Sequence, residues 1–315
     1  MPAVSLKNIV KTYNGGKVKA VNDVSFDVEH GELFGLIGPD GAGKTSIFRI
    51  LTTLLLADQG SASVEGFDVV KDYRAIRNKV GYMPGKFSLY QDLTVAENLK
   101  FFATIFNTTV EENYDLIKDI YDQIKPFNTR PAGKLSGGMK QKLALCCALI
   151  HKPKVLFLDE PTTGVDAVSR KEFWEILKLL KQQHISILVS TPYMDEASLC
   201  DRIALFQNGN IMSLDTPQNI ISAFPVQLYA AKAKDFYLLL KNFRSDPAIE
   251  NCYAFGEYLH FTLKENDNSE MVLKTLQSKY QPEDFEIKRI TPTIEDTFIR
   301  FMRENEKPVE ENEKM

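Results

Sequence analysis

The sequence has no hydrophobic run long enough to cross a membrane. A helix needs about 20 mostly apolar residues to span a bilayer, and the longest purely apolar run, Leu143–Ile150, is far shorter. The first ten residues, MPAVSLKNIV, lack the basic and then apolar order of a signal peptide. We therefore expect the chain to stay in the cytosol and to reach a membrane only through a partner protein.

Cysteine is scarce, and its spacing indicates no metal or redox site. The four cysteines are Cys146, Cys147, Cys200 and Cys252, and none of them forms a CxxC pair. Two are adjacent inside an apolar stretch of helical character. Reduced, buried side chains are the expectation for such cysteines, ahead of metal binding or redox chemistry.

An excess of positive charge is also missing. The net charge is −4 and the pI is about 5.7, so the overall balance gives no indication of nucleic-acid binding. The remaining composition, 44% hydrophobic and 25% charged, is that of an ordinary globular protein. A length of 315 residues allows one large domain and a small one.

The first part of the chain, up to about residue 222, alternates short apolar runs with helical patterns. Strands separated by helices predict an α/β domain with a mostly parallel sheet. Residues 86–150 are instead largely helical in pattern and predict a helical subdomain inserted between strands. The expected strands are Val4–Val10, Val24–Val28, Leu33–Ile37, Val155–Leu158, Ile185–Val189 and Ile203–Phe206.

A second, smaller domain is expected after the boundary at Phe224-Pro225. Its pattern over residues 226–303 reads strand, helix, strand, strand, helix, strand, which predicts an α+β module of the ferredoxin-like type. A last helix begins at Thr293, where Thr293 and Asp296 match a capping box. Residues 304–315 are charged and without apolar spacing, so we expect a disordered tail.

The segment GPDGAGKT, Gly38–Thr45, matches the phosphate-binding pattern G-x-x-x-x-G-K-[ST]. Gly41 and Gly43 allow backbone N–H groups to turn toward phosphate oxygens, and the following helix directs its positive end to the same anion. Lys44 is expected to reach the β- and γ-phosphates, and Thr45 to hold Mg²⁺. The alternative, a glycine turn that matches by chance, is weakened by the apolar strand just before it. The residues expected to bind nucleotide here are Gly38, Pro39, Asp40, Gly41, Ala42, Gly43, Lys44, Thr45 and Ser46.

A second motif, VLFLDEP, places two carboxylates at the end of a buried strand. Ligands bind at the carboxyl ends of strands in parallel sheets, and Asp159 and Glu160 stand there. We expect Asp159 to bind Mg²⁺ through water and Glu160 to polarise the attacking water. An acidic pair at a strand end is common, but together with a phosphate loop it predicts a nucleotide-hydrolysing site.

A third motif, LSGGMKQK, follows the helical segment, and with it the chain resembles an ATPase subunit of ABC transporters. The resemblance covers about residues 3–222: phosphate loop, helical insert, Leu135-Ser136-Gly137-Gly138, VLFLDEP and the turn Thr162–Asp166 occur in that family's order. It implies the P-loop ATPase fold, with a mostly parallel core sheet, an antiparallel β subdomain and a helical subdomain. It also implies ATP and Mg²⁺ as ligands.

The resemblance assigns roles to further residues. In this family two subunits pack head to tail, and the Leu135, Ser136, Gly137 and Gly138 segment completes the partner's site. On its own, Ser136 stands where a helix N-cap belongs and the two glycines permit close approach to an oxyanion.

Three further positions carry an implied role with a plain alternative beside it. Tyr13 matches the aromatic residue that stacks on adenine, although a tyrosine at a strand end is commonly a packing residue. Asp166 matches the turn that links the two sites across the dimer. Residues 86–103 resemble the part that meets the transmembrane partner, and an amphipathic helix packed on its own core would give a similar pattern.

The motif set is similar to that of bacterial drug and multidrug exporters, especially the first half of those with two ATPase halves in one chain. The elements MDEA and IEDTFIRFM carry this part of the resemblance. It implies an exporter subunit that is cytoplasmic and peripheral on the inner face of the cell membrane, bound there through a transmembrane permease. The transported substrate is not encoded in this chain, because selectivity lies mostly in the permease.

Two positions depart from the family pattern. Most members have a histidine, which contacts the γ-phosphate, where this chain has Pro192, and a glutamine, which touches Mg²⁺, where it has Gly85. Gln91 lies six residues farther along and is a poor substitute. Our hypothesis is an ATP-holding, weakly hydrolysing site paired with a different ATPase subunit. The alternative is a homodimer that tolerates both changes.

Three functions are compatible with these motifs. The first is the ATPase engine of a membrane exporter, driven by ATP-dependent dimer closure. The second is a soluble ABC protein acting on ribosomes or DNA, but such proteins usually have two ATPase halves or long coiled coils, and this sequence has one phosphate loop and no long heptad segment. The third is a soluble regulatory ATPase that binds ATP with little turnover.

Overall fold

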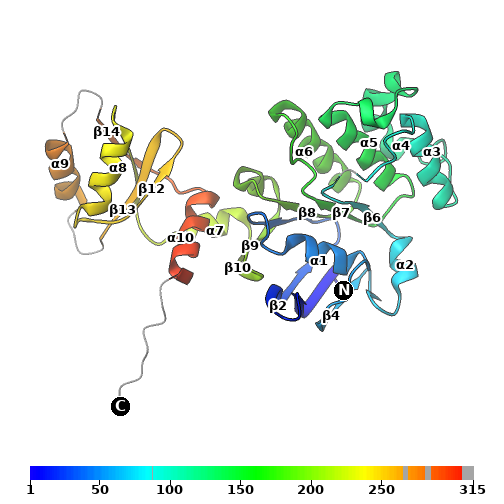
Figure 1. The fold of residues 1–315 in the computed structure, drawn as a ribbon, viewed down its shortest axis with the longest axis horizontal. Helices are drawn as coiled ribbons and strands as arrows, with labels where there is room; N and C mark the ends of the chain where they lie inside the picture. Colours follow the sequence, from blue (N-terminus) through cyan, green and yellow to red (C-terminus); the bar gives the residue numbers. More distant parts are fainter. Residues whose placement is uncertain (87, 265–268, 281–284, 307–315) are drawn as a thin grey trace, which may run out of the picture. The chain divides into compact units, whose positions relative to one another are not determined.

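The computed structural model describes residues 1–86, 88–264, 269–280 and 285–306 of the chain. It divides into two compact units, Met1–Gln218 and Asn219–Met315, and each is described by itself (Figure 1). The sequence had placed the end of the first domain at residue 222. The division falls instead inside α7 (Pro217–Ser222), a short helix with two adjacent isoleucines, which continues the apolar pattern across the boundary.

A six-stranded sheet forms the centre of the first unit. All neighbouring strands are parallel except the pair β9 and β10. Every residue of β3 and β7 is buried, as expected for strands of a parallel sheet covered on both faces. In sheet order the strands are β10 (Asn210–Asp215), β9 (Arg202–Gln207), β3 (Leu33–Ile37), β8 (Ser186–Thr191), β7 (Val155–Asp159) and β6 (Val80–Met83).

A second, antiparallel sheet lies beside the central one, with helix α1 (Lys44–Leu51) between them (Figure 1). Helix α1 buries Ile47, Phe48, Ile50 and Leu51 in a core shared with side chains from both sheets. This core fixes the start of α1, and with it the phosphate loop, against the central sheet. In sheet order the strands are β2 (Val18–Val28), β1 (Val4–Tyr13), β4 (Gln59–Val64) and β5 (Phe67–Asp68).

The remaining elements of the first unit are helical. Residues 86–150 hold most of them, and α3 begins with a full capping box between Thr94 and Glu97. The α-helices are α2 (Tyr73–Arg77), α3 (Val95–Ile105), α4 (Tyr114–Ile124), α5 (Gly137–Leu149) and α6 (Ala167–Gln182). The 3₁₀ helices are η1 (Lys125–Phe127), η2 (Ala132–Lys134) and η3 (Met194–Leu199).

The second unit is a small α+β domain built on a four-stranded antiparallel sheet of order β12-β13-β11-β14. Its elements run strand, helix, strand, strand, helix, strand, followed by a last helix that starts with the expected capping box of Thr293 and Asp296. They are β11 (Leu228–Lys232), α8 (Phe236–Ser245), β12 (Ile249–Phe255), β13 (Tyr258–Leu263), α9 (Ser269–Lys279), β14 (Glu286–Ile290) and α10 (Ile294–Glu306).

The expected tail of residues 304–315 begins too early, because α10 continues through Glu306. The residues RENE that end this helix are good helix formers for the most part, so the helix does not stop where apolar spacing stops. Residues 307–315, the rest of the expected tail, lie outside the described part of the chain.

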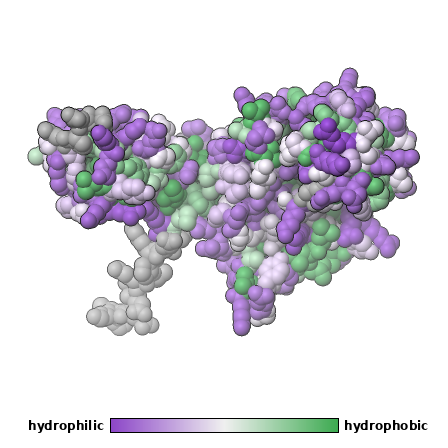
Figure 2. All heavy atoms as spheres, turned by 45° about the horizontal axis from the view of Figure 1, so that its top comes forward, coloured by the Kyte–Doolittle hydropathy of each residue, from purple (hydrophilic) through white to green (hydrophobic). Residues whose placement is uncertain are grey.

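The surface visible in Figure 2 is mostly hydrophilic on both units. Over the ranges that the structure describes, no helix is both long and apolar enough to span a membrane. All four cysteines are buried and free, and burial raises the pKa of Cys146, Cys147, Cys200 and Cys252. These thiols are therefore protonated at neutral pH, as expected for packing residues.

Candidate nucleotide-binding site

Three strands of the central sheet end side by side and build the candidate site. In the parallel register Ile37 of β3 pairs with Thr191 of β8, and Asp159 of β7 pairs with Ser190 of β8. The phosphate loop follows β3, the two carboxylates end β7, and Pro192 follows β8. Residues that are far apart in the sequence therefore meet at one edge, as in other parallel sheets.

The phosphate loop needs glycine at two places for lack of space. A Cβ at Gly38 would lie 1.9 Å from the carbonyl oxygen of Phe206, and a Cβ at Gly43 would lie 1.9 Å from that of Ala20. Gly43 also has a φ of 110°, which L side chains rarely adopt. The loop is therefore pressed against two neighbouring backbones, and this contact fixes its shape.

Lys44 points back into the loop from the first turn of α1. Its Nζ donates hydrogen bonds to the carbonyl oxygens of Gly38 at 2.7 Å and Pro39 at 2.9 Å. It also lies 3.1 Å from Oε1 of Glu160. Lys44 is only 2% exposed, so this ammonium is a buried charge compensated by carbonyls and one carboxylate.

Asp159, Thr45 and Ser190 form a cluster of oxygen atoms beside Lys44. The hydroxyls of Ser190 and Thr45 donate to Oδ1 of Asp159, at 2.7 Å and 3.3 Å. Hydroxyl and carboxylate oxygens are ligands that Mg²⁺ prefers, so these residues fit the ion. Burial, and then the charge of Asp159, raise the pKa of Tyr82 to about 12.

Glu160 has a backbone conformation that a non-glycine residue seldom adopts. Its φ is 52°, in the left-handed region. Its backbone N–H is held by Ser190, at 3.1 Å from the carbonyl oxygen and 3.0 Å from the hydroxyl. Ser190 thus contacts the carboxylate of Asp159 and the backbone of Glu160. No sequence motif pointed to Ser190, although its place in register with Asp159 follows from pairing the two strands.

Tyr13 lies at the end of β1, next to the phosphate-loop helix. Its hydroxyl is 3.0 Å from the hydroxyl of Ser46 in α1, and the ammonium of Lys11 lies 5.8 Å from the centre of its ring. This contact holds the tyrosine beside the loop. Its stacking on adenine stays a prediction.

The two departures from the family pattern lie on the same edge. A Cβ at Gly85 would be 3.0 Å from the carbonyl oxygen of Asp159 and 3.9 Å from Cβ of Glu160, so position 85 directly adjoins the carboxylates. Pro192 directly follows Thr191, the last residue of β8. The backbone oxygen of Gln91 accepts a hydrogen bond from Gly133 at 2.8 Å, which ties Gln91 to the helical subdomain.

The Leu135-Ser136-Gly137-Gly138 segment begins helix α5. Ser136 is its N-cap and accepts a hydrogen bond from the N–H of Met139 at 3.3 Å. A Cβ at Gly138 would lie 2.6 Å from Oγ of Ser169, so glycine allows α5 to pack on the start of α6. Leu135 is buried beneath this segment.

Asp166 is the N-cap of α6 and accepts hydrogen bonds from the N–H groups of Val168 at 3.1 Å and Ser169 at 3.0 Å. The bond from Ser169 is the main reason why the pKa of Asp166 is lowered. This local role exists within a single chain. The predicted coupling role across a dimer stays a prediction beside it.

The site and the fold can now be compared with known proteins. The family model described as ABC transporter matches residues 21–163. The doxorubicin resistance ATP-binding protein DrrA of Mycobacterium tuberculosis (strain CDC 1551 / Oshkosh) is 36% identical over 221 residues, which are 69% of this chain and 67% of that protein. This chain belongs to the ABC transporter family. The resemblance inferred from LSGGMKQK is thereby confirmed.

Other relatives in the ABC transporter family differ in length from this chain. The probable multidrug ABC transporter ATP-binding protein YbhF of Escherichia coli (strain K12) is 37% identical over 300 residues, 94% of this chain. The chain spans about half of that relative, 51% of its length. Among solved structures, an ATP binding subunit of an ABC transporter has a TM-score of 0.64 at 25% identity, covering 70% of this chain and 93% of that one.

A second solved structure, an ATP-binding cassette of an ABC transporter in its ADP conformation, has a TM-score of 0.61 at 26% identity. It covers 71% of this chain and 96% of that one. These likenesses confirm the predicted fold class of the first unit, an ABC ATPase with a mostly parallel core sheet. The predicted small α+β C-terminal domain is confirmed by the sheet and helices of the second unit.

Proposed function

We propose that this chain is the ATP-binding and ATP-hydrolysing subunit of a membrane exporter of the multidrug type. The observation that carries the proposal is the convergence of Lys44, Thr45, Asp159 and Glu160 at one sheet edge, with direct contacts from Lys44 to Glu160 and from Thr45 to Asp159. The relatives named as multidrug and doxorubicin resistance ATP-binding proteins support the exporter part.

Each of these side chains has a distinct task in the proposed reaction. Lys44 exchanges the carbonyl oxygens of Gly38 and Pro39 for oxygens of the β- and γ-phosphates. Thr45 and Asp159 would hold Mg²⁺, which would supply positive charge to neutralise the phosphates. Glu160, freed from Lys44 by the phosphates, orients and polarises the attacking water.

We further propose that this site turns ATP over slowly and that its productive partner is a different ATPase subunit. Gly85 has no side chain and Pro192 has neither a polar side chain nor a backbone N–H, so neither offers a side-chain group that could contact a γ-phosphate. The Leu135-Ser136-Gly137-Gly138 segment, by contrast, is complete and N-capped. It would therefore serve the partner subunit's site while this chain holds ATP. A tolerant homodimer is the competing arrangement.

A groove in the first unit supports contact with a transmembrane permease. It encloses about 440 Å³ between the helical subdomain and the central sheet. Its lining is largely apolar and includes Met83, Leu89, Phe102, Ile105 and Phe106, and Ile105 is 53% exposed. We place a cytoplasmic helix of the permease here, which would hold the chain on the inner face of the cell membrane.

We also propose that the second unit is a ferredoxin-like module. Its element order and its sheet order β12-β13-β11-β14 support this assignment. The βαββαβ sequence pattern over residues 226–303 had predicted the same module.

The proposed function is tested by the steady-state ATPase rate of the purified chain at increasing protein concentration, with Glu160→Gln as the control. ATP binding with a low rate at every concentration, which still falls further in Glu160→Gln, supports the asymmetric pair. A substantial rate that rises faster than linearly with concentration and is lost in Glu160→Gln supports the homodimer. Failure to bind ATP at all would contradict both. Co-fractionation with membranes that depends on a permease separates the exporter from a soluble regulatory ATPase.

A further inference from the structure

A buried carboxylate with no assigned task lies just behind the candidate site. Glu196 belongs to η3 and is 2% exposed. Its carboxylate accepts hydrogen bonds from Oγ1 of Thr162 at 2.9 Å and 3.2 Å and from Oγ1 of Thr191 at 2.5 Å. Both threonines are also buried, at 1% and 0% exposure. One side chain therefore joins two segments that end different strands.

Each threonine is directly connected to the candidate site. Thr162 is the second residue after Glu160, in the turn that follows β7. Thr191 ends β8, and its carbonyl oxygen accepts a hydrogen bond from the N–H of Gly38, the first residue of the phosphate loop, at 3.2 Å. Glu196 thus connects the segment that carries Glu160 to the segment that holds the phosphate loop.

The same contacts close the loop that contains Pro192. The N–H of Tyr193 donates to Oγ1 of Thr191 at 3.0 Å, while that hydroxyl donates to Glu196. The chain therefore turns back on itself within residues 191–196, around a proline whose φ is fixed. The segment after β8 is held by hydrogen bonds among its own residues.

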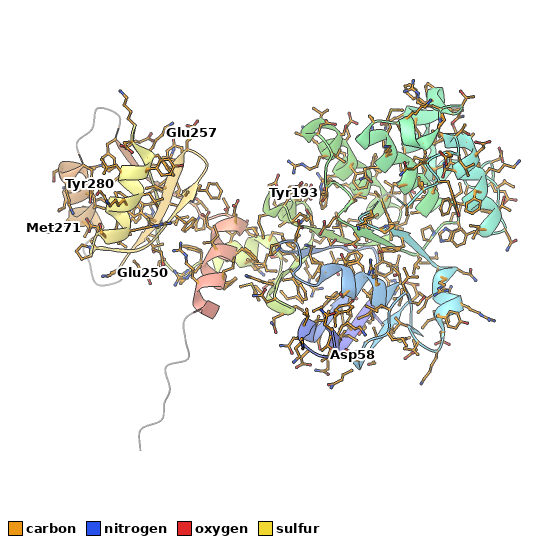
Figure 3. The ribbon with its side chains drawn as sticks, viewed as in Figure 1. Asp58, Tyr193, Glu250, Glu257, Met271 and Tyr280 are labelled. Atoms are coloured by element: carbon orange, nitrogen blue, oxygen red, sulfur yellow. The ribbon has the colours of Figure 1, made fainter. Side chains whose placement is uncertain are left out.

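The cation nearest to Glu196 is too distant for a strong ion pair. Nε of Arg170 lies 3.8 Å from Oε1 of Glu196, and the same guanidinium lies 3.7 Å from Asp195 and 4.8 Å from the ring centre of Tyr193, which Figure 3 labels. Burying a carboxylate has a desolvation cost that such a pair does not fully offset. The hydrogen bonds from Thr162 and Thr191 offset part of that cost, and they also fix the positions of the two threonines relative to each other.

We propose that Glu196 is a positioning residue for ATP hydrolysis, which holds the Glu160 segment in place relative to the phosphate loop. This inference rests on the proposed function. Glu196 acts through Thr162 and Thr191 and does not reach the phosphates itself. Its loss should affect turnover more than ATP binding, because the loop's contacts with Lys44 are made without it.

The test measures kcat, KM for ATP and melting temperature of the full chain with Glu196→Ala, Glu196→Gln and Thr162→Val. A misplacement on the order of 1 Å costs about a hundred-fold in rate, so we expect Glu196→Ala to lower kcat by roughly ten-fold or more, with KM changed by less than about two-fold. Glu196→Gln should lose less, because an amide can still bridge the two hydroxyls.

Two controls sharpen the test. Asp195→Asn alters an exposed carboxylate that approaches the same Arg170, and it should leave kcat unchanged. Thr162→Val combined with Glu196→Ala should be no slower than Glu196→Ala alone, because both remove one shared contact. If Glu196→Ala does not fold, Glu196→Gln and Thr162→Val still decide the question.

The outcomes separate this inference from the proposed function. If Lys44→Ala binds ATP as well as the unaltered chain, the proposed function itself fails. If ATP binding depends on Lys44 but turnover equals that of Glu160→Gln, there is no Glu160 activity to position, and only this inference is overturned. It is likewise overturned if Glu196→Ala lowers the melting temperature with kcat unchanged, or raises KM with kcat unchanged.

Discussion

The two sides of the candidate site are built from opposite kinds of residue. The end of β7 and the start of α1 supply carboxylates, a hydroxyl and an ammonium, from Asp159, Glu160, Thr45 and Lys44. The segments after β6 and β8 supply Gly85 and Pro192, which have no polar side chain. The groups proposed to hold phosphate and Mg²⁺ thus lie on different segments from positions 85 and 192, and only the first set has polar side chains in this chain.

The side of the site that contains Pro192 nevertheless has an ordinary backbone structure. Thr191 is the last residue of β8 and pairs with Ile37, so Pro192 stands one residue beyond the sheet, where no ladder hydrogen bond is required of it. The bond from Gly38 N–H to the carbonyl of Thr191 is intact at 3.2 Å. Pro192 therefore changes which side-chain groups are available and is compatible with the strand pairing and with the bond to Gly38.

The largest expected effect comes from removing Lys44, one of the polar and charged groups at the end of β7 and the start of α1. Lys44→Ala deletes a buried ammonium that contacts two carbonyls and Glu160. A charge-assisted hydrogen bond contributes about 1.5–3 kcal/mol, so losing those to the phosphates should weaken ATP binding by roughly a hundred-fold. Titration with a fluorescent ATP analogue measures this effect.

Lys44→Arg is the matched control, because it keeps the charge in a longer and planar group that the cramped loop cannot accommodate equally well. It should bind ATP better than Lys44→Ala and less well than the unaltered chain. Equal binding by all three proteins would mean that the phosphates bind elsewhere. The distinction between a phosphate-holding side and a side without polar groups would then be wrong.

Sequence reasoning predicted the parts of this site that depend on local pattern. The strands β3 and β7 are continuous apolar runs, and the phosphate loop and LSGG segment are local motifs. The strands expected from the sequence do not include β4, β5, β6 or β10. Only two residues of β4 are buried and β6 has only four residues, so neither gives a clear period in the sequence.

Contacts between distant segments could not be predicted in the same way. Ser190 and Glu196 serve the site through strand register and through a turn that folds back. Neither residue belongs to a motif with a fixed spacing from the phosphate loop. Their roles depend on which strand lies beside which. The order β3-β8-β7 brings distant segments together: Gly38 and Thr191, for example, are more than a hundred residues apart in the sequence.

The second-largest expected effect comes from adding polar side chains at positions 192 and 85. Pro192→His adds a ring that can donate to a γ-phosphate, and Gly85→Gln adds an amide beside Asp159. An aligned polar donor commonly changes a rate by about a hundred-fold. We expect a smaller gain of roughly ten-fold for the double variant, because a Cβ at position 85 meets the carbonyl of Asp159 at 3.0 Å and forces a small shift.

The measurement is steady-state ATPase activity in the assembled complex, with the same two changes in a Glu160→Gln background as the control. Pro192→His alone should account for most of the gain, since position 192 lies past the end of the sheet and is only half-buried. No gain in the double variant would show that the site is not limited by these two positions.

The smallest expected effect concerns Asp166, whose two roles can be separated. Serine is as good an N-cap as aspartate, so Asp166→Ser should keep the hydrogen bonds to Val168 and Ser169. The melting temperature should then stay within about two degrees of the unaltered chain, a shift well below that of a 1 kcal/mol change in a small domain. The carboxylate itself is lost. If it couples the two sites across the dimer, turnover should fall by a few-fold, about the effect of losing one surface charge contact.

Asp166→Ala is the matched control, because it removes the cap and the charge together and should lower the melting temperature as well as turnover. The pKa of Asp166 is lowered in the folded chain, so the stability from its charge is complete at neutral pH and is lost only as pH falls through that lowered pKa. Both variants are therefore compared at pH about 7, well above the model-peptide value for aspartate. If Asp166→Ser keeps full turnover, the carboxylate serves only as a helix cap, and the coupling between the two sites must pass through other residues of the turn.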